Sequence, residues 1–383
     1  MTPYRIARAA AGAAIAIILI AALYGGLERL GWRLPPVEAG TNSVHGALMI
    51  PGFFGAVIGV ERAVALTTGA RSRRARLAFA GPALCALGAL LLVLDPGGAA
   101  GRLALTGGSF ALVCVYAVVI WRQPTLFTVT MGAGAYALLI GNTLWSSGKP
   151  IYAIVHWWIA YLVLTIVGER LELARMVRPT PGRTATFAGA ALLYLGGVAA
   201  TVFAPDTGTR LAGAGMLALA AWLARYDIAR RTVRQRGLTR FIAVCLLAGY
   251  AWLAIGGGLA LTLGFAGKAY GYDAILHSVL LGFVFSMIFG HAPIILPAVA
   301  RLPVPYHPRF YAHFILLHAS LILRVVGDLA GSPVARRWGG LGNEIAVVLF
   351  LLLTARAVLS SRHASPARAE LRHPSPITPS TGR

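Results

Sequence analysis

Three apolar segments of the chain have a histidine as their second residue: VHGALMIPGFFGAVIGVER (44–62), VHWWIAYLVLTIVGER (155–170) and LHSVLLGFVFSMIFGH (276–291). Neutral imidazole is the commonest metal ligand in proteins and the usual axial ligand of haem iron. Met49 follows His45 by one helical turn, and could pack on a bound ring or act as a second kind of ligand. His45, His156 and His277 are therefore candidates for coordination of a metal or of haem iron. The alternative is that each ring only bonds a neighbouring helix.

The same segments end in polar residues that follow a glycine: Glu61 and Arg62, Glu169 and Arg170, and His291. Arginine is favoured at a helix C-terminus and its head reaches toward lipid headgroups, which explains these residues without a further role. The functional alternative is proton relay by the glutamates or binding of haem propionates by the arginines. Propionates are poor partners, because a haem at the histidine ends would be ~20 Å away. His291 follows His277 by 14 residues, so an ideal helix points both to one side.

One further apolar segment, 309–329, carries four polar residues: His313, His318, Arg324 and Asp328. Arg324 and Asp328 have i,i+4 spacing and can pair, which would lower the cost of burying them. The two histidines are separated by about 140° around the helix, so they cannot easily bind one ion together. A structural role is favoured for the Arg–Asp pair and for His318.

The composition excludes a cytosolic domain. Of the 383 residues, 58% are apolar and 12% are charged, and the mean hydropathy is +0.74, whereas soluble domains contain about 25% charged residues. The three cysteines are too few for a disulfide scaffold. A formal charge of +22 would suggest nucleic acid in a soluble protein, but the basic residues here form short clusters between apolar runs. We therefore expect a lipid bilayer as partner and no nucleic acid. We also expect no ATP, because the Gly-x-x-x-x-Gly-Lys loop is missing.

Twelve apolar runs are long enough to cross a bilayer as helices, which takes about 20 residues each: 9–30, 43–66, 77–94, 102–121, 125–145, 151–174, 185–204, 210–229, 239–265, 274–299, 309–329 and 339–360. With the N-terminus inside, the inner segments hold 24 Lys and Arg and the outer loops hold 8. Because cytoplasmic loops carry the excess of basic residues, both termini are predicted to be cytoplasmic. The first run lacks a convincing cleavage site and is predicted to be an uncleaved span. We expect a multi-pass protein of the cytoplasmic (inner) membrane.

The histidine segments fall on the second, sixth and tenth runs, which predicts one repeat every four helices. Four-helix units keep the same direction, so the three histidines should lie at one depth toward the outer surface. We expect an all-α fold with a single twelve-helix membrane domain over 1–360, in three pseudo-repeated four-helix arcs. The arcs are about 9–121, 125–229 and 239–360. The basic, Ser/Pro-rich residues 361–383 are predicted to form a disordered tail.

The stretch from His45 reads His-Gly-x-Leu-Met followed by Gly-Phe-Phe-Gly. It resembles the second helix of haem–copper oxidase subunit I, where a histidine followed by Gly or Ala and then Met binds the low-spin haem. The stretch from Ile275, Ile-Leu-His-Ser-Val-Leu-Leu-Gly-Phe-Val-Phe, resembles the tenth helix of that subunit, whose His-x-His carries both haem ligands. That family also has a twelve-helix core in three arcs with the N-terminus inside. The resemblance implies a b-type haem held by His45 and His277.

The chain departs from that family at the dioxygen-reducing centre. Ile275 stands where the family has its high-spin haem ligand, run 185–204 has no histidine, and only His156 is left of the copper set. The histidine followed by Gly-Phe-x-Gly is also similar to NnrS-type membrane haem proteins, which are described as haem- and copper-containing and are linked with nitric oxide stress. The resemblance implies electron transfer or nitric oxide handling with a redox partner protein. Copper is compatible with it but not favoured.

Two other classes of function stay open. A secondary transporter would use the bundle as a substrate path and the Glu–Arg pairs as gates. A lipid-linked glycosyltransferase would need acidic residues on long outer loops, and only Glu28 and Glu38 precede the second run, so this class is the least favoured. Whether the chain is an enzyme is therefore undecided, with a haem-dependent redox protein as the enzymatic alternative.

Overall fold

The computed structural model describes residues 3–35, 40–67, 73–173, 180–265 and 270–363. Nine long helices within this part are uninterrupted: α1 (Pro3–Arg29), α5 (Ala99–Arg122), α6 (Leu126–Ser146), α7 (Ile151–Leu173), α8 (Pro181–Ala200), α9 (Pro205–Tyr226), α11 (Gly237–Leu263), α14 (Phe310–Leu329) and α15 (Pro333–His363). Three segments are composite: η1 (Thr41–Val44), α2 (His45–Ala47), η2 (Leu48–Phe54) and α3 (Gly55–Thr67); η3 (Arg73–Phe79) and α4 (Ala80–Leu94); and α12 (Gly271–His277), η5 (Ser278–Phe285), α13 (Ser286–Ile295) and η6 (Leu296–Ala300). A short helix, α10 (Ala229–Thr232), follows α9.

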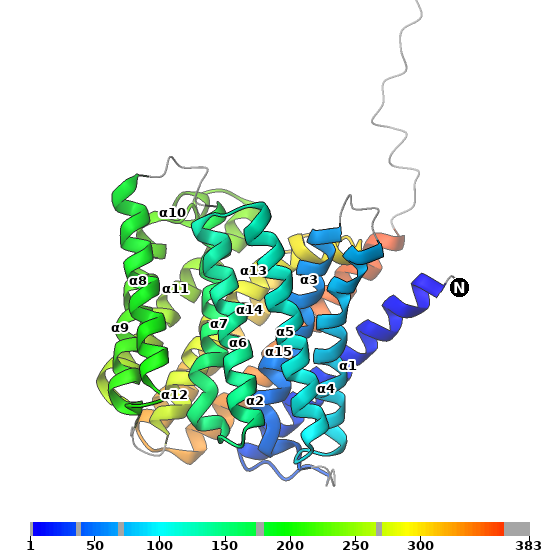
Figure 1. The fold of residues 1–383 in the computed structure, drawn as a ribbon. Coiled ribbons are helices and arrows are strands. Elements are labelled where there is room, and N and C mark those ends of the chain that lie inside the picture. The colour runs from blue at the N-terminus through cyan, green and yellow to red at the C-terminus, as the bar shows by residue number, and fades with distance from the viewer. Residues whose placement is uncertain (1–2, 36–39, 68–72, 174–179, 266–269, 364–383) are drawn as a thin grey trace, which may run out of the picture.

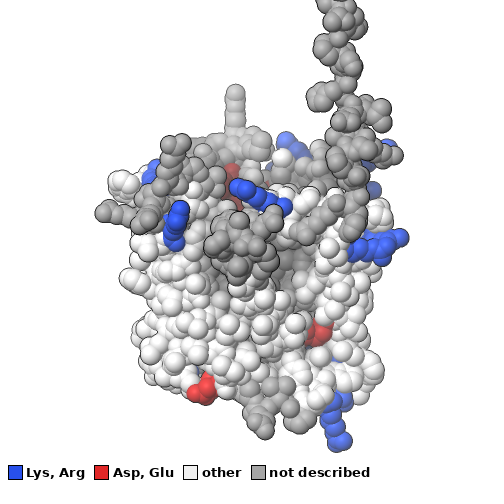
Figure 2. All heavy atoms as spheres, turned by 90° about the vertical axis from the view of Figure 1, so that its right-hand side faces the viewer, with Lys and Arg blue, Asp and Glu red and all other residues white. Residues whose placement is uncertain are grey.

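The prediction of an all-α protein is confirmed for the described residues, none of which lies in a strand. Ten of the helical segments are long and apolar enough to cross a membrane, and α8 and α9 are not among them. The helices run side by side with their connections at the two ends of the bundle (Figure 1). On the face drawn in Figure 2, the charged side chains lie mostly toward the two ends, and most of the described surface between them is uncharged. These are the features of a membrane-embedded protein.

Some helix boundaries differ from the predicted ones by a few residues. α9 spans Pro205–Tyr226 instead of 210–229, with Pro205 in its first turn and the extended backbone of Asp227 at its end. α15 likewise begins at Pro333 rather than near residue 339. Proline suits the first turn of a helix, where no backbone N–H is needed. A prediction from hydropathy alone misses these helix starts, because the first turns are not strongly apolar.

Two of the composite segments contain π-helical turns close after a histidine. η2 begins three residues after His45, and η5 begins directly after His277. Pro51 lies inside η2, where its missing N–H removes one i→i−4 bond and favours the wider turn. The third histidine segment, α7, is continuous α-helix. The prediction that His277 and His291 point to one side assumed an ideal helix, so it does not hold across the π-helical turns of η5.

The α8–α9 pair is packed through glycines. A Cβ atom on Gly197 would lie 2.2 Å from the backbone nitrogen of Ala212, and one on Gly215 would lie 2.4 Å from Cα of Tyr194. Both distances are far below van der Waals contact, and the atoms that would have to move are backbone. The two helices can therefore approach this closely only because both positions are glycine.

We expect Gly197→Ala to destabilise the protein, since overpacking of this kind costs about 1–3 kcal/mol. The neighbouring Gly196 is a matched control, because a Cβ atom there meets nothing within 4 Å. Gly196→Ala should leave the melting temperature in detergent unchanged or slightly raised, because alanine favours the helix. Equal melting temperatures for the two variants would contradict this packing.

Candidate functional site

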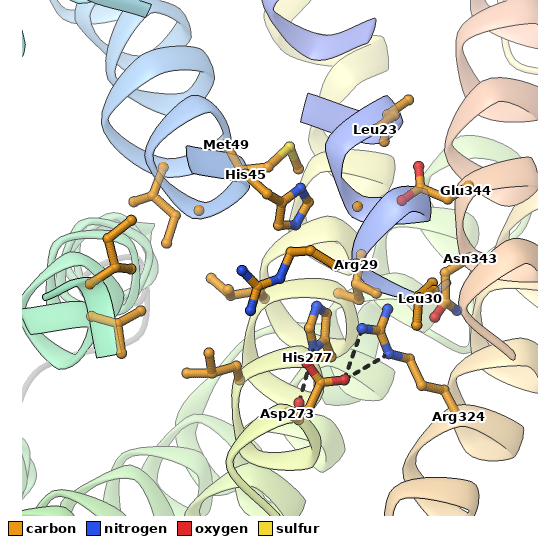
Figure 3. A pocket seen from close by; sticks show the side chains of 18 of the residues that line it. Leu23, Arg29, Leu30, His45, Met49, Asp273, His277, Arg324, Asn343 and Glu344 are labelled. Carbon is orange, nitrogen blue, oxygen red and sulfur yellow. Dashed lines mark hydrogen bonds and ion pairs between the residues drawn. The ribbon is translucent and has the colours of Figure 1, made fainter. Parts of the chain in front are cut away.

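A cavity of about 300 Å³ lies between α1, the α2–η2 segment, the start of α7, the α12–η5 segment, α14 and α15. His45, Met49 and His277 all line it (Figure 3). The sequence predicted these three residues together, and the fold brings them to one space from segments more than two hundred residues apart. His156, Glu61 and Arg62 are not among its lining residues, and neither are Glu169, Arg170 and His291.

The two cavity histidines are held in the same way, through Nδ1, and both keep Nε2 for the cavity. Nδ1 of His45 lies 2.7 Å from the carbonyl oxygen of Ala22. Nδ1 of His277 lies 2.9 Å from the carbonyl oxygen of Asp273. A carbonyl oxygen only accepts, so Nδ1 carries the hydrogen in both rings and the lone pair of the neutral ring is on Nε2. Neither Nε2 has a hydrogen-bond partner within the described ranges.

The other intramembrane histidines are engaged elsewhere. Nε2 of His156 lies 3.3 Å from the hydroxyl of Thr209 on α9. Trp252 donates to Nδ1 of His318 at 2.8 Å, and the other nitrogen of that ring lies 3.4 Å from Ser286. These rings bond to neighbouring helices, and His156 is not among the residues that line the cavity.

His291 and His313 also lie away from the cavity. His291 donates from Nδ1 to the carbonyl oxygen of Met287 at 2.6 Å, and its Nε2 lies 3.4 Å from Arg170. His313 is 1% exposed, and neither ring nitrogen has a hydrogen-bond partner in the described chain. Phenyl rings enclose it, with that of Phe289 at 4.5 Å between centroids and that of Phe350 at 5.3 Å. The prediction that His313 and His318 do not bind one ion together agrees with these separate surroundings.

The carboxylate of Asp273 joins the charged side of the cavity. It lies 2.9 Å from Arg324 and 3.5 Å from Arg336, and 3.3 Å from Nδ1 of His277. Arg324 therefore pairs with Asp273 and not with Asp328, the partner that its i,i+4 spacing allowed. Asp328 lies 3.0 Å from Arg336 instead, because α12 and α15 bring nearer partners than the next turn of α14. Asp273 and Arg336 were missed by the sequence analysis, and the one available signal was the i,i+4 spacing of Asp273 and His277.

Three more polar residues line the cavity, namely Arg29, Asn343 and Glu344, and each leaves polar atoms unpaired within the described structure. Arg29 donates to the carbonyl oxygen of Asn42 at 3.2 Å, and no carboxylate lies within ion-pair distance of it in the described structure. Its side chain lies between His45 and His277 in Figure 3. The oxygens Oε2 of Glu344 and Oδ1 of Asn343 are buried and have no hydrogen-bond partner among the described residues. The cavity thus has polar atoms available to a ligand.

Two aromatic side chains form an apolar boundary of the cavity. Phe54 of η2 and Phe285 of η5 both line it, and their ring centroids are 5.7 Å apart in an edge-to-face arrangement. Such contacts contribute about 0.5–1.5 kcal/mol beyond the area they bury. The cavity is therefore charged on the side of Asp273 and apolar on the side of these rings.

A second polar cluster joins the opposite ends of the histidine segments. Arg62 pairs with its neighbour Glu61 at 3.2 Å and also with Glu169 of α7. Arg170 binds both oxygens of Asp227 at 2.8 and 3.0 Å. The side chains of Arg170 and Asp227 are only 4% and 1% exposed. These residues tie helices together, which supports the structural interpretation of the Glu–Arg motifs.

The buried pair of Arg170 and Asp227 should be a strong contributor to stability. Arg170→Leu leaves the carboxylate buried and unpaired, which we expect to cost about 3–5 kcal/mol. The double variant Arg170→Leu/Asp227→Asn should recover much of this loss, because asparagine is neutral and keeps an oxygen for the N–H of Ala229. Melting temperatures in detergent measure the effect. A double variant no more stable than Arg170→Leu would contradict the assignment.

Among the described residues, no group of three or more His, Cys, Asp or Glu could hold a metal ion. No curated protein matches the chain. A family described as a domain of unknown function (DUF8744) matches residues 7–359, which include every residue that lines the cavity. The chain belongs to the DUF8744 family.

Proposed function

We propose that this chain is a membrane protein that binds one b-type haem, which His45 and His277 would hold through Nε2. The observation that carries the proposal is the shared geometry of the two rings. Each donates Nδ1–H to a carbonyl oxygen and leaves Nε2 without a partner in the described structure, at the surface of one cavity. Histidines that bind metals almost always donate their other N–H in this way.

The remaining lining residues suit the two ends of a haem. The apolar boundary of Phe54 and Phe285 suits the macrocycle, and Arg324 and Arg336 are cations near the charged end where carboxylates would lie. Met49 can pack against the ring. Arg29 has to leave the space between the imidazoles, which its long, exposed side chain permits. Iron with two histidine ligands has no open position, so the group would supply electron transfer rather than oxygen activation.

We further infer that twelve helices cross the membrane, α8 and α9 included, in three four-helix units of a cytoplasmic (inner) membrane protein. α8 and α9 have 20 and 22 residues, which correspond to about 30 Å of helix each. Large apolar side chains are exposed on and between them, such as Leu192 at 69% and Phe203 at 91%. The excess of basic residues supports cytoplasmic termini.

The haem proposal predicts a coloured protein. Protein from haem-replete cells should show a bis-histidine spectrum, and His45→Ala or His277→Ala should abolish it because each removes an axial ligand. His156→Ala and His307→Ala are the controls, since His156 bonds Thr209 and His307 bonds the N–H of Arg309, both away from the cavity. Colourless wild-type protein would exclude haem.

The metal content should be one haem per chain with negligible copper. Dioxygen reduction needs a second haem with an open position and a copper ion, and stable copper sites need three or four ligands. His156 is one imidazole and already has a hydrogen-bond partner, so we propose no oxidase turnover. Two haems per chain, or stoichiometric copper that is lost in His156→Ala, would contradict this.

The second candidate is a secondary transporter of a small molecule. Two observations favour it. The segments of His45 and His277 both contain π-helical turns, and the opposite charges of Arg29 and Glu344 line one cavity. Broken helices at a central site are common in transporters. A transporter would be colourless and would accumulate a substrate in liposomes, and Glu344→Gln would stop that accumulation.

The proposed topology can be tested at three loop positions: Ala99, Lys149 and Lys268. Ala99 begins α5 and Lys149 lies between α6 and α7, while Lys268 lies outside the described residues. Cysteines placed at all three should react with a membrane-impermeant reagent added to intact cells, because all three are expected on the outer side. One protected position among them would break the alternation of twelve spans.

A further inference from the structure

We propose that a groove between α8 and α9 binds one acyl chain of an anionic phospholipid, with its phosphate at the arginine-rich end of the pair. The groove has a volume of about 470 Å³. Its base is formed by Ala190 and Trp222, which are 7% and 4% exposed. Small side chains make up most of its sides: Gly189, Ala218 and Ala221, with Leu193 beside them.

The groove lies at the edge of the molecule. α8 and α9 form one side of the bundle in Figure 1, and α8 packs chiefly on α9. A Cβ atom added to Gly189 would meet no atom within 4 Å, so the space above this residue is open. In a membrane protein that space is filled by lipid or by another helix, because both are apolar.

Charge decides between these two occupants. Arg225 lines one end of the groove, and six arginines lie between residues 225 and 240 with Asp227 as the single acid. Asp227 is buried and bound by Arg170, so it does not offset them. Arginines at a membrane surface attract anionic lipids by about 1 kcal/mol each. The end of the groove is therefore complementary to a phosphate group.

The same charge disfavours a second copy of the chain. Gly182, Gly189 and Gly196 are seven residues apart and each faces open space, so they form a smooth strip on one side of α8 that a neighbouring helix could approach. Two copies share one orientation in the membrane, so a symmetric dimer across this strip would set their arginine-rich ends side by side. This repulsion favours a lipid with a negative headgroup.

Native mass spectrometry tests the proposal on the purified full chain. The protein is mixed with equal amounts of phosphatidylglycerol and phosphatidylcholine of the same acyl composition. Wild-type protein should retain one phosphatidylglycerol in preference. Gly189→Leu should lose it, because leucine fits the open space and fills the groove. Arg225→Gln with Arg231→Gln should lower the preference for phosphatidylglycerol by about thirtyfold, because two arginines are lost.

Gly196→Leu and Arg122→Gln are the matched controls. Gly196 has the same open surroundings on the same helix but does not line the groove, and Arg122 is an exposed arginine at the end of α5. Both should retain lipid as the wild type does. Equal retention of the two lipids by the wild type, or equal loss in Gly196→Leu, would overturn the proposal. A wild-type dimer that Gly189→Leu converts to monomer, with lipid retention unchanged, would show that a second copy occupies the groove.

Discussion

The cavity depends on the ion pairs that the carboxylate of Asp273 makes. This carboxylate lies within 3.5 Å of Arg324 on α14, Arg336 on α15 and His277 on its own helix. A charge within an apolar bundle is costly unless it is paired, and here one carboxylate offsets two guanidinium groups with the help of Asp328. Loss of Asp273 would leave two like charges facing each other. The orientation of His277 and the spacing of α12, α14 and α15 therefore have a common origin.

Features of the structure that depend on neighbours along the chain could be predicted from the sequence. In a bilayer each helix satisfies its own backbone, so apolar length alone indicates where helices form. His45 and Met49 share a face because i,i+4 geometry is local. The pairing of Arg324 could not be predicted in this way. Its partner, Asp273, comes from a helix about fifty residues earlier, and sequence spacing along α14 contains no information about which helix packs beside it.

The three histidine segments show how far a sequence repeat can guide the assignment of a site. His45 and His277 precede π-helical turns and face one cavity, whereas His156 lies in an uninterrupted α-helix and bonds Thr209 of α9. All three stand in the first two turns of their segments. Which helix each ring faces depends on local helical geometry and on neighbouring helices, and these differ among the segments although the residue pattern is shared.

The two polar clusters differ in whether their groups have partners. Arg170 and Asp227 bind each other through both oxygens, so this pair needs nothing further. At the cavity, Arg29 lies between the imidazoles while the nearby Glu344 has a buried oxygen without a partner among the described residues. A buried acceptor left unsatisfied costs about 1–3 kcal/mol. A Cβ atom on Gly26, one turn before Arg29 on α1, would lie 2.9 Å from the other oxygen of Glu344. Glu344 thus lies beside α1 within one turn of Arg29, so the cavity holds an acid and a base that are close together but have no ion-pair partner in the described structure, whereas the charges of the second cluster are paired.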